Sequence, residues 1–327
     1  MELSPAVQKA ILQRYARLLS SLDGELGERP LVLPTAEFFP DTFTHDQRSL
    51  TRLTKRMQVH AGMDDIPVTA TLVGDTPEGG GGCSTGACGV GSAGADGSEV
   101  ARIVDTGERW VLNVPAAEVK HPVVLTSNIA RALASIFLAE TRDDETPLDE
   151  PMDVTVDLAA VALGFGVLVM QGSYIYSKSC GGPSVAKVTS LGPGELAVAL
   201  AAFAARGKHP IKAALKQLDP TQREALSDAR ELFESNESVV ALLRESPARL
   251  AEGDFKLEEP KPWLLRALGR KSAKERTPDE LSLEEMETLL AVAPPAANKK
   301  KPKKSRDDDE LGSLVAEALR EAHSDAE

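Results

Sequence analysis

Apolar residues recur at helical spacing over most of the chain, so the hydrophobic pattern predicts a largely helical protein. The first such segment starts at Ser4-Pro5, where the serine suits the cap and the proline suits the first helical position. Its apolar residues recur every three or four positions as far as Leu22. Further helices are expected over Asp46–Ala61, Ser127–Glu140, Asp153–Tyr176, Glu195–Arg206, Pro220–Phe233 and Asn236–Leu243.

Four shorter stretches favour β-strands. Val68–Val73 is rich in β-branched residues, and Pro30–Pro34 is a short apolar run. Glu99–Val104 and Arg109–Val114 flank an Asp-Thr-Gly-Glu turn, which is typical of a hairpin. The loop Gly79–Gly97, before the hairpin, is too rich in glycine to fold alone. The pattern therefore predicts an α+β protein with a small mixed sheet and a helix-rich second half.

The composition divides the chain into two parts. Residues 1–265 are expected to form one globular domain, because their apolar pattern is continuous. Residues 266–327 are dominated by Lys, Glu, Pro and Ala, with a basic run at Lys299–Arg306 and an acidic run at Asp307–Glu310. Such a segment buries too little apolar area to offset the entropy of ordering it. We therefore expect a disordered, charged tail with short transient helices.

The overall charge limits the partners that the protein can have. The formal net charge is −13, which opposes binding to nucleic acid and to anionic membranes. The longest apolar run, Leu158–Met170, is shorter than the ~20 residues that a membrane-spanning helix needs. Met1–Leu22 has the pattern of an amphipathic helix and not of a secretory leader. Three cysteines, an odd number, are atypical of a secreted disulfide framework. A cytoplasmic protein is expected.

Four stretches of the chain form a recognisable set: LVLPTAEFFPD (Leu31–Asp41), SNIARALASIFLAE (Ser127–Glu140), DLAAVALGFGVLV (Asp157–Val169) and LGPGELAVALAAFA (Leu191–Ala204). In these stretches the chain resembles a family of uncharacterised bacterial zincin-like proteins. The resemblance runs from Leu31 to Glu234, about two-thirds of the chain. It implies a zincin-like domain in which one helix carries His-Glu-x-x-His and an acidic segment opens the next helix.

The residues that form the metal site of such a protein differ in this chain. In a His-Glu-x-x-His helix, two histidines one turn apart bind zinc, and the glutamate activates the zinc-bound water. The resemblance places the histidine positions at Ser127 and Arg131 and the glutamate position at Asn128. Serine is a poor zinc ligand, arginine is a permanent cation, and asparagine cannot accept a proton. The downstream acidic positions correspond to Asp153 and Asp157, and two acids alone do not rebuild the site.

Arg131 is the replacement with the clearest physical consequence. Its guanidinium could take the place of the missing cation and form a buried ion pair with Asp157 or Asp153. Alternatively, Arg131 lies on the solvent-facing side of its helix, if the correspondence is off by a residue or two.

The three cysteines suggest a second kind of site. Cys83 and Cys88 lie inside the glycine-rich loop, and Cys180 follows the long apolar helix. Three thiols suit zinc, with His121 or His209 as a fourth ligand. A second functional interpretation is a redox-responsive Cys83–Cys88 pair. The third interpretation is a loop whose cysteines have no function.

The end of the tail suggests a docking peptide. Its predicted helix, Asp309–Ala322, begins with acidic residues and then carries one apolar stripe. The stripe consists of Leu311, Leu314, Val315 and Leu319. A short amphipathic helix on a disordered tether is typical of a segment that folds on a protein partner. It could instead pack on its own domain or stay disordered.

Together these features predict a non-catalytic pseudo-metallopeptidase that acts as a binding or scaffold protein and recruits a partner through its tail. No cofactor is expected, apart from zinc if the cysteine loop binds it. Two other classes stay open: a metal or redox protein that uses Cys83, Cys88 and Cys180, and an active hydrolase whose ligands the sequence does not reveal.

Overall fold

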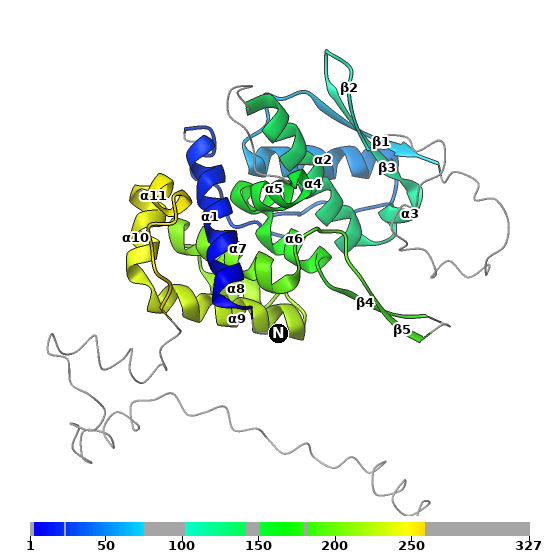
Figure 1. Ribbon diagram of the computed structural model, residues 1–327. Coiled ribbons are helices and arrows are strands. Elements are labelled where there is room, and N and C mark those ends of the chain that lie inside the picture. Colours follow the sequence, from blue (N-terminus) through cyan, green and yellow to red (C-terminus); the bar gives the residue numbers. More distant parts are fainter. Residues whose placement is uncertain (1–2, 23, 75–101, 142–150, 180–181, 259–327) are drawn as a thin grey trace, which may run out of the picture. The chain divides into compact units, whose positions relative to one another are not determined.

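A computed structural model describes residues 3–22, 24–74, 102–141, 151–179 and 182–258, and the predicted tail lies outside these ranges. The compact unit is Met1–Lys261. It combines many helices with a small mixed sheet, which confirms the α+β class (Figure 1). The helices and helical turns are α1 (Pro5–Ser21), α2 (Gln47–Ala61), α3 (Ala116–Val119), α4 (Pro122–Thr141), α5 (Met152–Ala160), η1 (Val161–Phe165), α6 (Gly166–Gly172), α7 (Pro193–Gly207), α8 (Ile211–Leu215), α9 (Pro220–Ser235), α10 (Glu237–Glu245) and α11 (Pro247–Ala251).

The main sheet has three strands in the order β1-β3-β2. They are β1 (Val68–Val73), β2 (Ile103–Asp105) and β3 (Trp110–Pro115). β1 and β3 are parallel, with Val68 opposite Trp110, whereas β2 and β3 form the predicted antiparallel hairpin. Glycine at position 107 has a φ of +79°, which suits the turn between β2 and β3.

Helix α2 is fastened to the outer edge of β1 by one side-chain amide. The Gln47 amide nitrogen donates to the carbonyl of Ala70, and the Gln47 amide oxygen accepts from the N–H of Leu72, both at 2.7 Å. This amide therefore makes the two hydrogen bonds to β1 that a backbone peptide group of a neighbouring strand would make. The contact fixes α2 beside the sheet (Figure 1).

The core lies where α4, α5, α6 and α7 pack together, and α1 covers α5 and α7 (Figure 1). The segment Met152–Gly172 is nearly continuous and is interrupted by the π-helical turn η1. At Gly164 in that turn φ is +94°, and a Cβ atom there would overlap the carbonyl oxygen of Pro30. Glycine is therefore required at this position, because the chain before α2 passes directly against the turn.

One predicted strand and one predicted helix boundary need correction. Pro30–Pro34 is not a strand, because the N–H of Val32 bonds to the carbonyl of Gly164 in the helical segment, and none of the described strands pairs with it. The long apolar helix ends at Gly172 and not at Tyr176. After it, β4 (Ile175–Ser179) and β5 (Gly182–Ala186) form a separate antiparallel hairpin that the sequence pattern did not predict.

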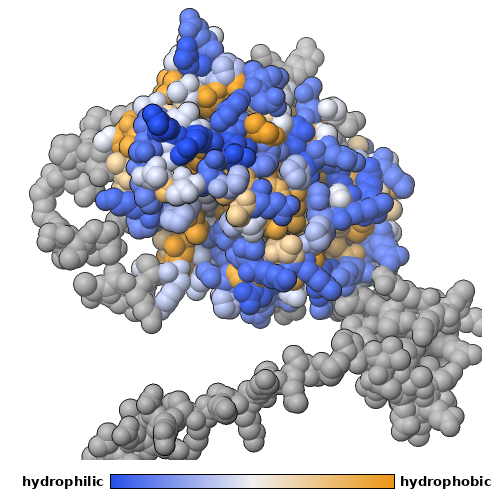
Figure 2. Space-filling model, turned by 180° about the vertical axis from the view of Figure 1, so that it is seen from behind, coloured by the Kyte–Doolittle hydropathy of each residue, from blue (hydrophilic) through white to orange (hydrophobic). Residues whose placement is uncertain are grey.

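Two helical segments are apolar and long enough to cross a membrane by length and composition. Among the described residues they are Pro122–Thr141 and Met152–Gly172, and the second extends beyond the uninterrupted apolar run Leu158–Met170 because the helical segment includes polar residues at both ends. In the structure, 61% and 83% of their apolar windows are buried among other elements. Core helices of a soluble protein share these properties. The face seen in Figure 2 is mainly hydrophilic with scattered apolar patches, which is also consistent with a soluble protein.

A buried tyrosine on α1 provides a test of this core. Tyr15 is fully buried, and its hydroxyl has no hydrogen-bond partner among the described residues. Burial accordingly raises the pKa of Tyr15 well above its usual value. An unpaired buried hydroxyl costs stability, so Tyr15→Phe should leave the free energy of unfolding unchanged or raise it by up to ~1 kcal/mol. Urea unfolding measures this, with the exposed Tyr176→Phe as the control; a clear loss of stability would mean that the Tyr15 hydroxyl is bonded.

Candidate functional site

The five site positions predicted from the sequence lie on two adjacent helices. Ser127, Asn128 and Arg131 belong to α4, and Asp153 and Asp157 belong to α5. The structure brings Arg131 together with both aspartates. It directs Ser127 and Asn128 to other partners.

Arg131 and Asp157 form a short, largely buried ion pair. The Arg131 Nε donates to Asp157 Oδ1 at 2.7 Å, and Nη1 donates to the carbonyl of Val188 at 2.9 Å. The Asp157 side chain is 0% exposed and that of Arg131 is 21% exposed. Asp153 is more distant, at 3.8 Å from Arg131 Nη2, and its side chain is 77% exposed. Arg131 therefore faces the interior, and the alternative in which it lies on the solvent face is wrong.

The second oxygen of Asp157 fastens the chain that leads into α7. Asp157 Oδ2 accepts the backbone N–H groups of Ser190 and Leu191, at 2.8 and 2.9 Å. Together with the bond from Arg131 to Val188, these contacts join α4, α5 and residues 188–191 through one pair of side chains. A buried carboxylate that accepts from three donors, one of them a guanidinium, has the contacts that a structural ion pair requires.

Ser127 is enclosed where α4 meets α6. Its hydroxyl donates to the carbonyl of Leu168 at 2.7 Å, and the residue is 0% exposed. Gly172 lies so close that a Cβ atom on it would overlap the Ser127 side chain. An imidazole at position 127 would not fit into this contact without separating the two helices.

Asn128 belongs to a second polar group, which extends toward the sheet. Its amide nitrogen donates to Glu118 Oε2 on α3 at 3.0 Å, and Glu118 also pairs with Arg102. Glu118 therefore binds one cation and one amide, and Asn128 serves as a donor. A general base must accept a proton, which an amide in this arrangement does not do.

The residues at these five positions do not fit a zinc ion. Zinc requires several nitrogen, sulfur or carboxylate ligands that converge on one point. Here the space beside Asp157 is taken by a permanent cation, and Ser127 points away from it to a carbonyl. Among the described residues, no group of three or more His, Cys, Asp and Glu side chains lies close enough to hold a metal ion.

The ionisation of Asp157 gives a test by pH. Burial raises the pKa of Asp157, while Arg131 and the two backbone N–H groups oppose that rise. Arg131→Met removes the largest opposing effect, so the pKa of Asp157 should rise further in the variant. An acid whose pKa is higher in the folded than in the unfolded protein takes up its proton first in the folded state. A fall in pH therefore stabilises the folded state relative to the unfolded chain. The stability lost through Arg131→Met should therefore be greatest near pH ~7 and shrink toward pH ~4.

Urea unfolding of both proteins at several pH values measures this effect. Arg109→Met is a matched control, because the Arg109 side chain is 55% exposed and its ion pair is with the exposed Glu108, at 3.9 Å. The control should show a small difference that does not vary with pH. A loss of stability for Arg131→Met that is constant from neutral to acidic pH would contradict the pairing.

Other predicted sites lie outside the described residues. They comprise the cysteines Cys83, Cys88 and Cys180 and the tail residues Leu311, Leu314, Val315 and Leu319. Of the two histidines considered as a fourth ligand, His209 stacks on Phe203, with ring centroids 4.9 Å apart. Burial lowers the pKa of His209, which favours its neutral form.

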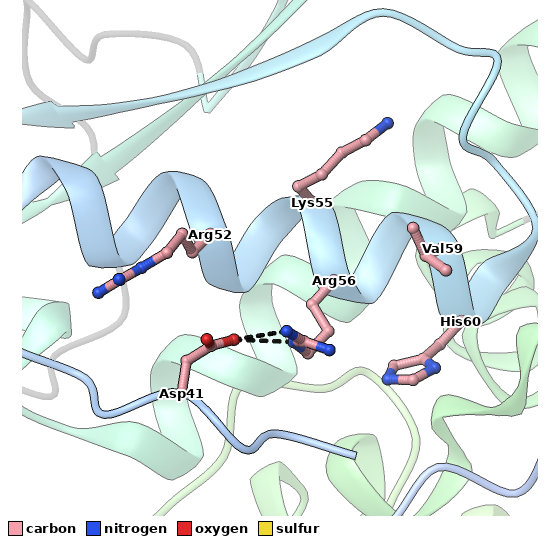
Figure 3. A pocket seen from close by; sticks show the side chains of 6 residues that line it. All are labelled: Asp41, Arg52, Lys55, Arg56, Val59 and His60. Atoms are coloured by element: carbon pink, nitrogen blue, oxygen red, sulfur yellow. Dashed lines mark hydrogen bonds and ion pairs between the residues drawn. The ribbon is translucent and has the colours of Figure 1, made fainter.

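The structure also contains a groove on α2 that the sequence analysis missed. Its volume is about 300 Å³ (Figure 3). The lining residues are Asp41, Arg52, Lys55, Arg56, Val59 and His60. A signal was present in the sequence, since Gln47–Ala61 contains four Arg and Lys residues and no Asp or Glu.

Comparisons with known proteins identify no relative for this fold or site. No protein-family model, no curated protein and no solved structure matches the chain.

Proposed function

We propose that this protein is a non-catalytic binding protein built on a zincin-like scaffold, in which an ion pair replaces the metal centre. The observation that carries the proposal is the contact of Arg131 with Asp157 at 2.7 Å. Arg131 is the α4 residue that the sequence resemblance aligns with a zinc-binding histidine. It is paired with a fully buried acid on the next helix.

The chemistry of the pair supports a structural role. A guanidinium stays protonated at all physiological pH values and therefore neither binds zinc nor removes a proton. Its charge satisfies the buried carboxylate, which otherwise would be left uncompensated. The neighbouring Ser127 and Asn128 each donate a hydrogen bond to a fixed partner, so they support the same packed arrangement.

The test measures zinc binding and peptide hydrolysis together. The full chain is compared with a variant in which Cys83, Cys88 and Cys180 are changed to serine, and with Asp157→Ala in that background. Each protein is equilibrated with zinc, freed of excess metal and assayed on an unstructured protein such as casein. We expect no zinc-dependent hydrolysis by any of them, and no zinc retained by the cysteine-free chain.

The three proteins separate the competing functions. Zinc-dependent hydrolysis by the cysteine-free chain that disappears in Asp157→Ala would overturn the proposal and indicate an active metallopeptidase. Zinc held near one equivalent by the full chain and lost with the cysteines would instead support the metal-binding function of the cysteine loop.

The proposal includes a protein partner recruited by the tail and a cytoplasmic location, both of which rest on the sequence. The apolar stripe from Leu311 to Leu319 is the expected contact. Once a partner is identified by co-purification, its affinity should fall when Leu314 and Leu319 are changed to alanine. An unchanged affinity would remove the tail from the proposal.

A further inference from the structure

The outward face of α2 is a local positive region on an acidic protein. The chain has 50 Asp and Glu residues against 37 Lys and Arg residues. Within α2, however, the Asp, Glu, Lys and Arg side chains are all cations, namely Arg48, Arg52, Lys55 and Arg56. Arg48, Arg52 and Lys55 are exposed. An anion that approaches this helix meets cations along Gln47–Ala61, while the acids beside them are Asp41, which pairs with Arg56, and the cap residue Asp46, which lies near Arg52.

The groove combines these cations with apolar surface. Val59 is 54% exposed and lies one turn after Lys55. In Figure 3, Arg56 and His60 extend to one side of α2, toward Asp41, while Lys55 extends to the other side. Arg56 is bound to Asp41 at 2.7 Å, so it forms a fixed wall of the groove. The arginine and lysine stems add further apolar surface beside Val59.

His60 completes the floor in a fixed orientation. Its Nε2 lies 3.1 Å from the carbonyl of Phe38. The ring packs edge-on against Phe38 and Phe39, with centroids 5.3 and 5.9 Å apart. The segment Phe38–Asp41 is thereby held against α2, and the groove is already formed in the isolated protein.

We propose that this groove binds a short acidic peptide segment of a protein partner, with carboxylates on Arg52 and Lys55 and an aliphatic side chain on Val59. From Arg48 to Val59 the helix rises by about 16 Å, which an extended peptide of about five residues spans. Alternating acidic and aliphatic side chains complement a surface on which cations flank an exposed valine. The inference goes beyond the proposed function, because none of the six lining residues belongs to the ion-pair cluster on α4 and α5.

Two features favour a peptide over nucleic acid. The net charge of −13 repels a long polyanion, whereas a short acidic segment experiences mainly the local charge. Single-stranded nucleic acid is usually held by aromatic side chains on which bases stack. The only ring among the six lining side chains, that of His60, is covered edge-on by two phenylalanines.

The test uses a fluorescein-labelled peptide of sequence Asp-Glu-Leu-Asp-Glu and its amide analogue Asn-Gln-Leu-Asn-Gln. Binding to the full chain is measured by fluorescence anisotropy at about 50 mM salt and again at about 300 mM salt. The variant Arg52→Gln with Lys55→Gln removes two cations and leaves the Arg56–Asp41 contact in place. The control, Lys212→Gln with Lys216→Gln, removes two exposed cations near α8, away from α2 (Figure 1).

We expect the acidic peptide to bind the full chain, with about 10-fold weaker binding to the α2 variant and a change below about 2-fold in the control. Higher salt should weaken binding, and the amide analogue should bind much more weakly. Equal binding of the two peptides, equal binding by the α2 variant, or no saturable binding would overturn the inference. Stronger binding of a single-stranded oligonucleotide than of the acidic peptide would overturn it in favour of a nucleic-acid site.

Discussion

Changing Asp157 to alanine is expected to lower the free energy of unfolding by about 3–5 kcal/mol, the range for removing one partner of a buried ion pair. Asp157 is fully buried and accepts hydrogen bonds from Arg131, Ser190 and Leu191. Its loss would leave a cation and two backbone N–H groups without their acceptor. Because Arg131 is partly accessible to water, we expect a value toward the lower end of the range.

Asp153→Ala is the matched control for this prediction. Asp153 lies one helical turn before Asp157 and also faces Arg131, but at 3.8 Å and with a side chain that is 77% exposed. Exposed ion pairs contribute little, so this change should cost less than ~1 kcal/mol. Chemical unfolding of both variants compares the two. Equal losses would mean that burial of Asp157 has no special role.

Changing Gly164 to alanine should cost about 3–5 kcal/mol, because positive φ and steric overlap act together. The φ of +94° disfavours any residue with a Cβ atom, and that atom would overlap the carbonyl oxygen of Pro30. The N–H of Val32, two residues after Pro30, donates a hydrogen bond to the carbonyl oxygen of Gly164. Relief of the overlap would therefore require residues 30–32 to move away from the core.

Gly107→Ala separates the two effects. Gly107 has a φ of +79°, and apart from its two chain neighbours no described residue comes within 4 Å of a Cβ built there. It should cost only about 1–2 kcal/mol, from the backbone conformation alone. Urea unfolding of both variants gives the comparison. A cost for Gly164→Ala no larger than that for Gly107→Ala would show that the Pro30 segment is not packed as described.

The helices were predictable where local signals agree with tertiary packing. Ser4-Pro5 begins α1, and Asp46 caps α2 by accepting the N–H of Ser49 at 2.7 Å. The strand assigned to Pro30–Pro34 failed because its apolar residues pack on a helical turn and not beside another strand. The β4–β5 hairpin was missed because its sequence is short and polar, and Tyr176 and Val185 are both exposed.

The candidate site was predictable in part. The family resemblance was enough to suggest that Arg131 meets an acid on the next helix, either Asp153 or Asp157, and the structure shows the short contact with Asp157. The partners of Ser127 and Asn128 were not predictable, because Leu168 and Glu118 come from elements that only the tertiary fold brings close. The positive charge of α2 was visible in the sequence. The groove itself was missed, because it is formed by residues 38–41 packing against α2.

A double-mutant cycle tests most directly whether Arg131 and Asp157 act as one structural unit. The free energy of unfolding is measured for the unchanged protein, Arg131→Met, Asp157→Leu and the protein with both changes. We predict that the double variant is less destabilised than the sum of the single variants by at least ~2 kcal/mol, because each single change leaves a charged partner behind. Single effects that add to within ~0.5 kcal/mol would contradict the ion pair and the binding scaffold proposed from it.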